Sequence, residues 1–155
     1  MSRTALTRSM LLVSIVVLAI DQLSKWYVLE VLDLPHRLDV AVLPPFLNFR
    51  MAWNTGINFG LFGGGPGATR WFLIGITLVI SAALIWWVLR RRQPVLAIGA
   101  GLVLGGALGN ALDRFRHGAV ADFLNTSCCG INNPFSFNIA DIAIFAGAIW
   151  IAIKA

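Results

Sequence analysis

Four long stretches of apolar residues dominate the chain, separated by polar and mixed segments. They cover approximately residues 10–29, 71–89, 95–112 and 135–153. A helix needs about 20 mainly apolar residues to cross the roughly 30 Å hydrocarbon core of a bilayer. The pattern therefore predicts an all-α membrane protein with four transmembrane helices, built as one domain over residues 1–155.

The first stretch follows two arginines, as the apolar core of a secretory signal peptide does. It continues to residue 29 without a small-residue cleavage site, so we expect it to be retained as a helix. Asp21 and Lys25 lie one turn apart near its end and can pair on one face. This pair is either an interfacial anchor for the helix end or a support for a functional site.

Two long loops, residues 30–70 and 113–134, connect the predicted helices. Within the first, residues 47–54 alternate between apolar and polar side chains, which predicts a short strand. The glycine-rich residues 63–67 predict a flexible approach to the second helix. We therefore expect a small extracytoplasmic subdomain of β-like and loop structure.

The third stretch carries glycines at every fourth position. Gly101, Gly105 and Gly109 form a smooth face for close helix packing. Asn110 and Arg114 lie one turn apart beside this face. Gly118 is expected to end the helix.

Composition and charge set the environment. Hydrophobic residues make up 58% of the chain and charged residues 12%, which excludes a soluble globular domain. The net charge of +5 is too dispersed for nucleic-acid binding. Half of the basic residues occur in three short pieces, at Arg3 and Arg8, Arg90–Arg92, and Lys154. By the positive-inside rule, both termini are cytoplasmic and both long loops are outside.

Cys128 and Cys129 are adjacent, where a disulfide would be strained. We interpret them as ordinary small loop residues, with pairing to another molecule as the alternative, because no metal-ligand spacing surrounds them.

Asp141 is the only charge in the last apolar stretch, where an ionised carboxylate costs at least a few kcal/mol. Asp122 precedes this stretch on the same side of the membrane. Asp141 would lie about 9 Å along the helix, so both acids are expected near the outer surface. Two neighbouring carboxyls tend to share one proton and can activate water against a carbonyl without a metal or cofactor. Asn138 precedes Asp141 by three positions and shares its face.

Other interpretations remain open at this point. Asp141 could bond to Asn110 or Arg114 in a purely structural role, or carry protons or cations in a transporter. A lipid-phosphate transferase using magnesium would need several closely spaced acids. A non-catalytic assembly factor would tolerate replacement of both aspartates.

Five motifs, in order, resemble the lipoprotein signal peptidase (signal peptidase II) family of bacterial membrane aspartic proteases. They occupy residues 21–25 (DQLSK), 54–60 (NTGINFG), 105–114 (GGALGNALDR), 118–123 (GAVADF) and 137–141 (FNIAD). The resemblance covers nearly the whole chain.

The resemblance implies that Asp122 and Asp141 are the catalytic pair. It implies supporting or substrate-binding roles for Asn54, Gly56, Asn110, Arg114, Asn138, Asp21 and Lys25. The implied substrate is a prolipoprotein with a diacylglyceryl-modified cysteine, cleaved on the amino side of that cysteine in the bacterial inner membrane. Globomycin-type inhibitors and membrane phospholipid are the other implied partners.

Overall fold

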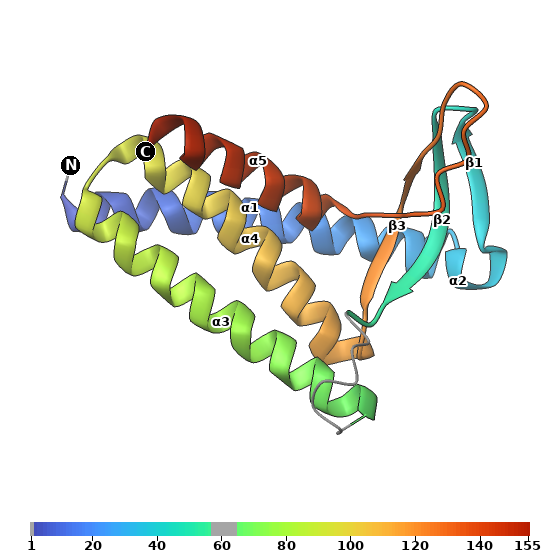
Figure 1. The fold of residues 1–155 in the computed structure, drawn as a ribbon, viewed down its shortest axis with the longest axis horizontal. Coiled ribbons are helices and arrows are strands. Elements are labelled where there is room, and N and C mark those ends of the chain that lie inside the picture. Colours follow the sequence, from blue (N-terminus) through green and yellow to red (C-terminus); the bar gives the residue numbers. More distant parts are fainter. Residues whose placement is uncertain (1, 57–64) are drawn as a thin grey trace.

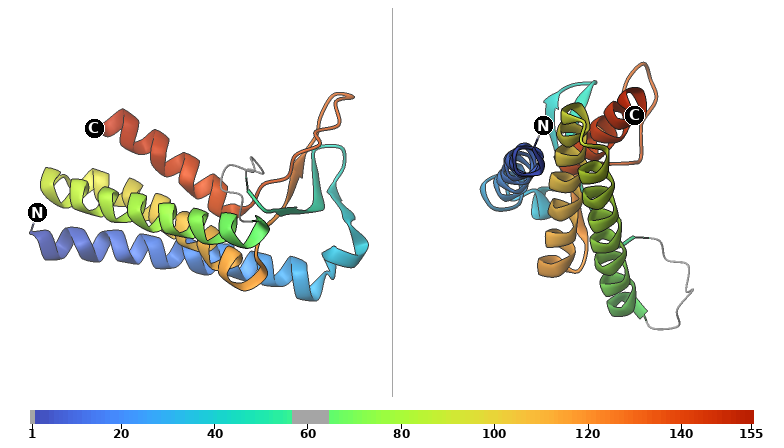
Figure 2. Two further views of the ribbon diagram at one scale, coloured as in Figure 1. Left: turned by 60° about the horizontal axis from the view of Figure 1, so that its bottom comes forward. Right: turned by 90° about the vertical axis from the view of Figure 1, so that its left-hand side faces the viewer.

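The structure, a computed structural model, describes residues 2–56 and 65–155. The helices are α1 (Arg3–Trp26), continued by the π-helical turn η1 (Tyr27–Val31), then α2 (Leu34–Arg37), α3 (Gly65–Arg91), α4 (Pro94–His117) and α5 (Ile139–Lys154). The strands are β1 (Asp39–Leu43), β2 (Leu47–Asn54) and β3 (Val120–Thr126). The long helices form a bundle, and the sheet stands at one end of it, away from both termini (Figures 1 and 2).

Among the described residues, three helices are long and apolar enough to cross a membrane: α1 with η1, α3 from Gly67, and α4. The first two begin earlier than the hydropathy pattern predicts, at Arg3 and Gly65. Gly65–Gly67 are therefore helical and are not the flexible approach that we expected. The rest of that tract and the end of the motif at residues 54–60 lie outside the described residues.

The fourth predicted span is shorter than expected, because α5 begins at Ile139 and not at residue 135. Its 16 residues extend about 24 Å at 1.5 Å per residue. Residues 135–138, which precede α5, are not helical, and Phe137 pairs with Leu124 of β3 instead. Asn138 then caps the helix by accepting a hydrogen bond from the backbone of Asp141.

The glycines of α4 allow its close contact with α1, as the sequence predicts. A Cβ atom at Gly101 would lie 2.8 Å from the carbonyl oxygen of Met10, and one at Gly105 would lie 2.7 Å from that of Ser14. Such separations leave no room for a side chain, so this face confirms the prediction of tight packing. The helix ends where Gly118 adopts a φ of +80°, also as predicted.

Gly106→Ala is expected to destabilise the protein, because the added Cβ would overlap the carbonyl oxygen of Ala140 in the first turn of α5. Overpacking of this kind costs about 1–3 kcal/mol. Gly75→Ala in α3 is the matched control, since nothing lies within 4 Å of a Cβ there. Thermal unfolding in detergent should separate the two variants, and equal melting temperatures would contradict the predicted contact.

The sheet has the order β1-β2-β3, with both pairs antiparallel. The predicted strand at residues 47–54 is confirmed as β2. The outer loop predicted at 113–134 contains β3, a strand that the sequence pattern did not indicate. Phe123 of β3 packs edge-to-face on Phe49, with ring centroids 5.6 Å apart, and joins a cluster with Val28 and Leu34. These contacts pack the sheet against η1 and α2.

The connection between β3 and α5 contains a disulfide between Cys128 and Cys129. The prediction of two ordinary loop residues is therefore wrong. Cys129 adopts a φ of +60°, and Gly130 follows with a φ of +81°. This left-handed turn brings the neighbouring sulfur atoms together.

Candidate active site

Asn138 and Asp141 form a reciprocal cap at the start of α5. The Asn138 side-chain oxygen accepts a hydrogen bond from the Asp141 backbone N–H at 2.9 Å. In return, Oδ2 of Asp141 accepts one from the Asn138 backbone N–H at 3.2 Å. Asp141 thus lies in the first turn of the helix, and not about 9 Å along it as expected, because the helix begins later. Asn138 caps the helix from outside instead of sharing a helical face with Asp141.

Asp122 lies on β3 and is nearly buried, with 4% of its surface exposed. Its Oδ1 accepts a hydrogen bond from the Asn138 side-chain amide at 2.6 Å. Its Oδ2 accepts one from the Asn54 side-chain amide at 3.1 Å. Asn138 therefore hydrogen-bonds both acids, and the two carboxyl groups come together at the junction of the sheet and α5.

Helix α4 contributes Asn110 and Arg114. The Asn110 amide donates to Oδ1 of Asp141 at 2.9 Å, and its oxygen accepts from the Asn138 amide at 3.1 Å. Arg114 donates weakly to the carbonyl oxygen of Asn110 at 3.4 Å, and its charge interacts with those of Asp122 and Asp141. Within the described residues, Nε of Arg114 is buried without a hydrogen-bond partner.

Asn54 and Gly56 follow the end of β2. The Asn54 side-chain oxygen accepts from the Gly56 backbone N–H at 2.9 Å, which turns its NH₂ group toward Asp122. Gly56 has a φ of +90°, a conformation that favours glycine. The pair thus orients a donor for the Asp122 carboxylate.

Asp21 and Lys25 pair at 2.8 Å, as their spacing predicts, and both side chains are buried within the protein. Lys25 also pairs with Asp113 at 2.7 Å and donates to Asn110 at 3.2 Å. Asp21 accepts from the Ala140 backbone N–H at 2.9 Å. This ion cluster, defined as Asp21, Lys25 and Asp113, joins α1, α4 and the start of α5.

Asp113 and Gln22 also belong to the site, although neither was predicted as a site residue. Asp113 accepts hydrogen bonds from the Ala121 backbone N–H beside Asp122 and from the Gln22 amide. Asp113 could have been predicted from its position three residues after Asn110, on the same side of α4. No group of three or more His, Cys, Asp or Glu residues is placed to hold a metal ion in the described parts of the chain.

Burial raises the pKa of Asp122 from 3.8 to about 6, with the negative charge of Asp141 adding to the effect and the Asn54 hydrogen bond opposing it. The folded protein therefore keeps a proton that the unfolded chain releases. The stability contribution of this group is present below about pH 4 and is lost as the pH rises through about 6.

Asp122→Asn is expected to remove this titration. Between pH 4 and 7 the melting temperature of the wild type should fall more steeply than that of the variant. The difference amounts to at most about 3 kcal/mol, since each pKa unit is worth about 1.4 kcal/mol. Thermal unfolding of both proteins across this pH range is the measurement, and parallel curves would contradict the prediction.

Similarity to solved structures indicates the class of protein to which this chain belongs. Two solved structures, both of bacterial membrane enzymes determined by the in meso method, share the fold. They have TM-scores of 0.78 and 0.75, each at 30% identity, and cover 94% of this chain and 90% and 85% of their own. Together with the apolar helices, they indicate a multi-pass membrane protein.

The family follows from the sequence. The model of signal peptidase (SPase) II matches residues 13–155, and this chain belongs to that family. It is 39% identical over 137 residues to the lipoprotein signal peptidase of Methylobacterium sp. (strain 4-46), covering 88% of this chain and 82% of that protein. It is 41% identical over 139 residues to that of Rhodopseudomonas palustris, covering 88% and 84%.

Proposed function

We propose that this chain is an aspartic endopeptidase that removes signal peptides from diacylglyceryl-modified prolipoproteins, cutting on the amino side of the lipidated cysteine. Family membership and the names of the relatives support the substrate class. They also favour a peptidase over the transporter, transferase and assembly-factor interpretations. The observation that carries the mechanism is the bridge that Asn138 forms between the two acids: its side-chain amide donates to Asp122, and its backbone N–H donates to Asp141.

In this mechanism the two carboxyl groups share one proton. Asp122 holds it, because burial raises the pKa of this carboxyl group. Asp141 is the base, since it lies at the N-terminus of α5, where backbone and side-chain amides donate hydrogen bonds to its carboxylate. Asp141 takes a proton from water while the water oxygen attacks the scissile carbonyl carbon. Asp122 donates its proton to the carbonyl oxygen, which gives a tetrahedral gem-diol. Asp141 then passes its proton to the leaving nitrogen, the C–N bond breaks, and a hydroxyl of the gem-diol returns a proton to Asp122.

The remaining site residues have supporting roles. Asn54, Asn110 and Asn138 orient the two carboxyl groups through the hydrogen bonds described above. The buried Nε of Arg114, unpartnered within the described residues, is available to a substrate carbonyl or its developing negative charge. Asp21 and Lys25 brace the first turn of α5. Gly56 directs the Asn54 amide. No metal ion or other cofactor takes part in this scheme.

The chain is proposed to lie in the bacterial cytoplasmic (inner) membrane as one domain of residues 1–155, with α5 as its fourth span. Both termini then face the cytoplasm, where the basic residues gather, and the sheet and active site lie near the outer face. The lipid chains of the substrate remain in the bilayer while its scissile bond reaches the interface. Globomycin-type inhibitors would occupy the same site, and nucleic acid is not a partner.

The test uses purified protein in detergent with a diacylglyceryl-modified precursor and the same precursor without lipid. Intact mass spectrometry follows both, with and without a chelator. We expect cleavage of the lipidated precursor alone, leaving its cysteine as the first residue of the product, at a rate that the chelator does not change. Equal cleavage of both precursors, or cleavage at another bond, would refute the substrate assignment.

A further inference from the structure

The end of the bundle opposite the sheet is strongly basic. Six of the twelve basic residues gather there, at the start of α1, the turn between α3 and α4, and the end of α5 (Figure 1): Arg3, Arg8, Arg90, Arg91, Arg92 and Lys154. No Asp or Glu occurs in residues 1–20, 71–112 or 142–155. The side chains at this end therefore include no carboxylate to pair with these basic residues, which favours an anionic ligand.

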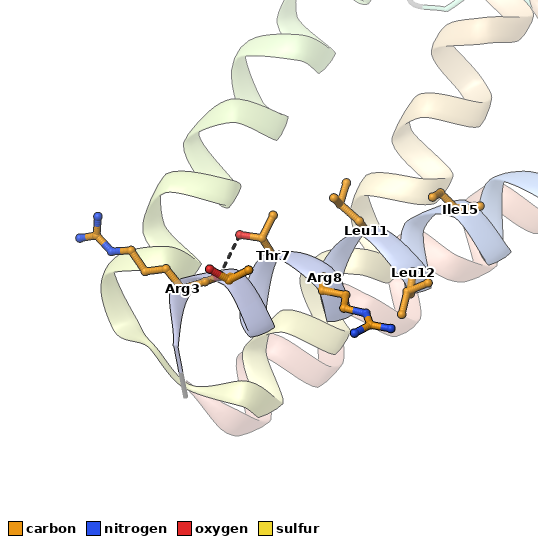
Figure 3. A pocket seen from close by; sticks show the side chains of 7 residues that line it. Arg3, Thr7, Arg8, Leu11, Leu12 and Ile15 are labelled. Atoms are coloured by element: carbon orange, nitrogen blue, oxygen red, sulfur yellow. Dashed lines mark hydrogen bonds between the residues drawn. The ribbon is translucent and has the colours of Figure 1, made fainter.

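Two hollows on the surface meet at this basic end. One is an open groove of about 610 Å³ along α1, lined by Arg3, Thr4, Thr7, Arg8, Leu11, Leu12 and Ile15 (Figure 3). The other, of about 290 Å³, lies between α1 and α3 and is lined by Arg3, Trp86, Leu89 and Arg90. Because Arg3 lines both hollows, a single ligand can reach from one into the other.

The groove on α1 combines charge at one end with exposed apolar surface along its length. Leu11, Leu12 and Ile15 are 55%, 55% and 60% exposed. The distance along the helix from Arg3 to Ile15 is about 18 Å, close to half of the roughly 30 Å hydrocarbon thickness. In the second hollow, the Arg90 guanidinium lies 5.0 Å from the centre of the Trp86 ring, an arrangement typical of the membrane interface.

We propose that an anionic phospholipid binds here, with its phosphate between Arg3 and Arg90 and one acyl chain over Leu11, Leu12 and Ile15. Arginine guanidinium groups match phosphate geometry, and basic pockets between transmembrane helices bind anionic headgroups. The apolar row receives the chain that must accompany such a headgroup. Charge complementarity holds in either leaflet, so the site does not depend on the orientation proposed above.

The bound lipid joins α1 to α3, which is the least buried of the three long apolar helices. Only 11% of the most apolar part of α3 is buried within the chain, compared with 56% for α4. Figure 2 shows α3 along one side of the bundle. A phosphate held by both Arg3 and Arg90 adds a link between these two helices, so the lipid is expected to stabilise the position of α3.

The test is native mass spectrometry of the purified full chain in detergent, titrated with phosphatidylglycerol or phosphatidylcholine of identical acyl chains. The wild type should retain phosphatidylglycerol at least about tenfold better, because its headgroup has a net negative charge, whereas the choline of phosphatidylcholine offsets the charge of its phosphate. Arg3→Gln/Arg90→Gln should lose this preference. The matched control, Arg91→Gln/Arg92→Gln, removes the same charge from the same end but lines neither hollow, and should keep it.

A second variant tests the groove separately from its charge. Leu12→Trp fills the groove and keeps every arginine, so it should also weaken phosphatidylglycerol retention. Melting temperatures of all variants establish that each one is folded. Equal retention of the two lipids by the wild type would overturn the proposal. So would an equal loss in the two arginine double variants, because the effect would then come from the general charge of this end.

Discussion

Asp122→Asn and Asp141→Asn are each expected to lower the rate of signal-peptide cleavage by about 10³-fold or more. General acid–base groups contribute about 10²–10⁴-fold each, and an amide neither takes a proton from water nor donates one as a carboxylic acid does. The asparagine variants keep the volume of the side chain and one hydrogen-bond acceptor. Single-turnover cleavage of the lipidated precursor is the measurement.

Asp39→Asn is the matched control for these variants. Asp39 is also a carboxylate on the sheet, but its side chain is 46% exposed and pairs with Arg50 at 2.9 Å. Its replacement should leave the cleavage rate within about twofold of the wild type, since exposed ion pairs contribute little. If Asp122→Asn or Asp141→Asn cleaves at the wild-type rate while folded, the catalytic assignment fails.

Lys25→Met is expected to cause the largest loss of stability. Lys25 is the cation between two buried carboxylates, Asp21 at 2.8 Å and Asp113 at 2.7 Å. Removing one member of a buried ion pair costs about 3–5 kcal/mol, because the remaining charge stays buried without compensation. Thermal unfolding in detergent measures the loss. Lys154→Met, at an exposed position, is the control and should leave the melting temperature unchanged.

The triple variant Asp21→Asn/Lys25→Met/Asp113→Asn identifies the cause. If uncompensated charge destabilises Lys25→Met, neutralising both carboxylates should recover most of the lost melting temperature. A triple variant as unstable as Lys25→Met would instead point to the lost hydrogen bonds. Cleavage should also fall in Lys25→Met, because Lys25 holds Asn110 and Asn110 holds Asp141.

Hydropathy and local patterning predict much of this fold. The strand at residues 47–54, the glycine face of α4 and the helix end at Gly118 all follow from short-range sequence features. The start of α5 does not, because hydropathy cannot distinguish apolar residues of a helix from apolar residues that pair with a strand. Phe137 belongs to the second kind. Asn138, a favoured capping residue, carried the correct signal for the helix start.

The candidate site shows the same limit. The Asp21–Lys25 pair is one helical turn long and could be predicted from spacing. The burial of this pair, and the second ion pair of Lys25 with Asp113, depend on α1 packing against α4, which no local pattern encodes. The burial of Asp122 likewise depends on β3. The sequence pattern does not predict this strand, because it is short and lies between two long apolar stretches.

Asp122 and Asp141 are proposed to act as one catalytic unit. The most direct test compares cleavage by Asp122→Asn, Asp141→Asn and the double variant, all confirmed as folded, on the lipidated precursor. Groups that act as a unit are strongly non-additive. If the two carboxyl groups share one proton, each single variant should lose nearly all activity, and the double variant should be no worse than either. Losses that multiply in the double variant would show two independent contributions and would contradict a shared-proton pair.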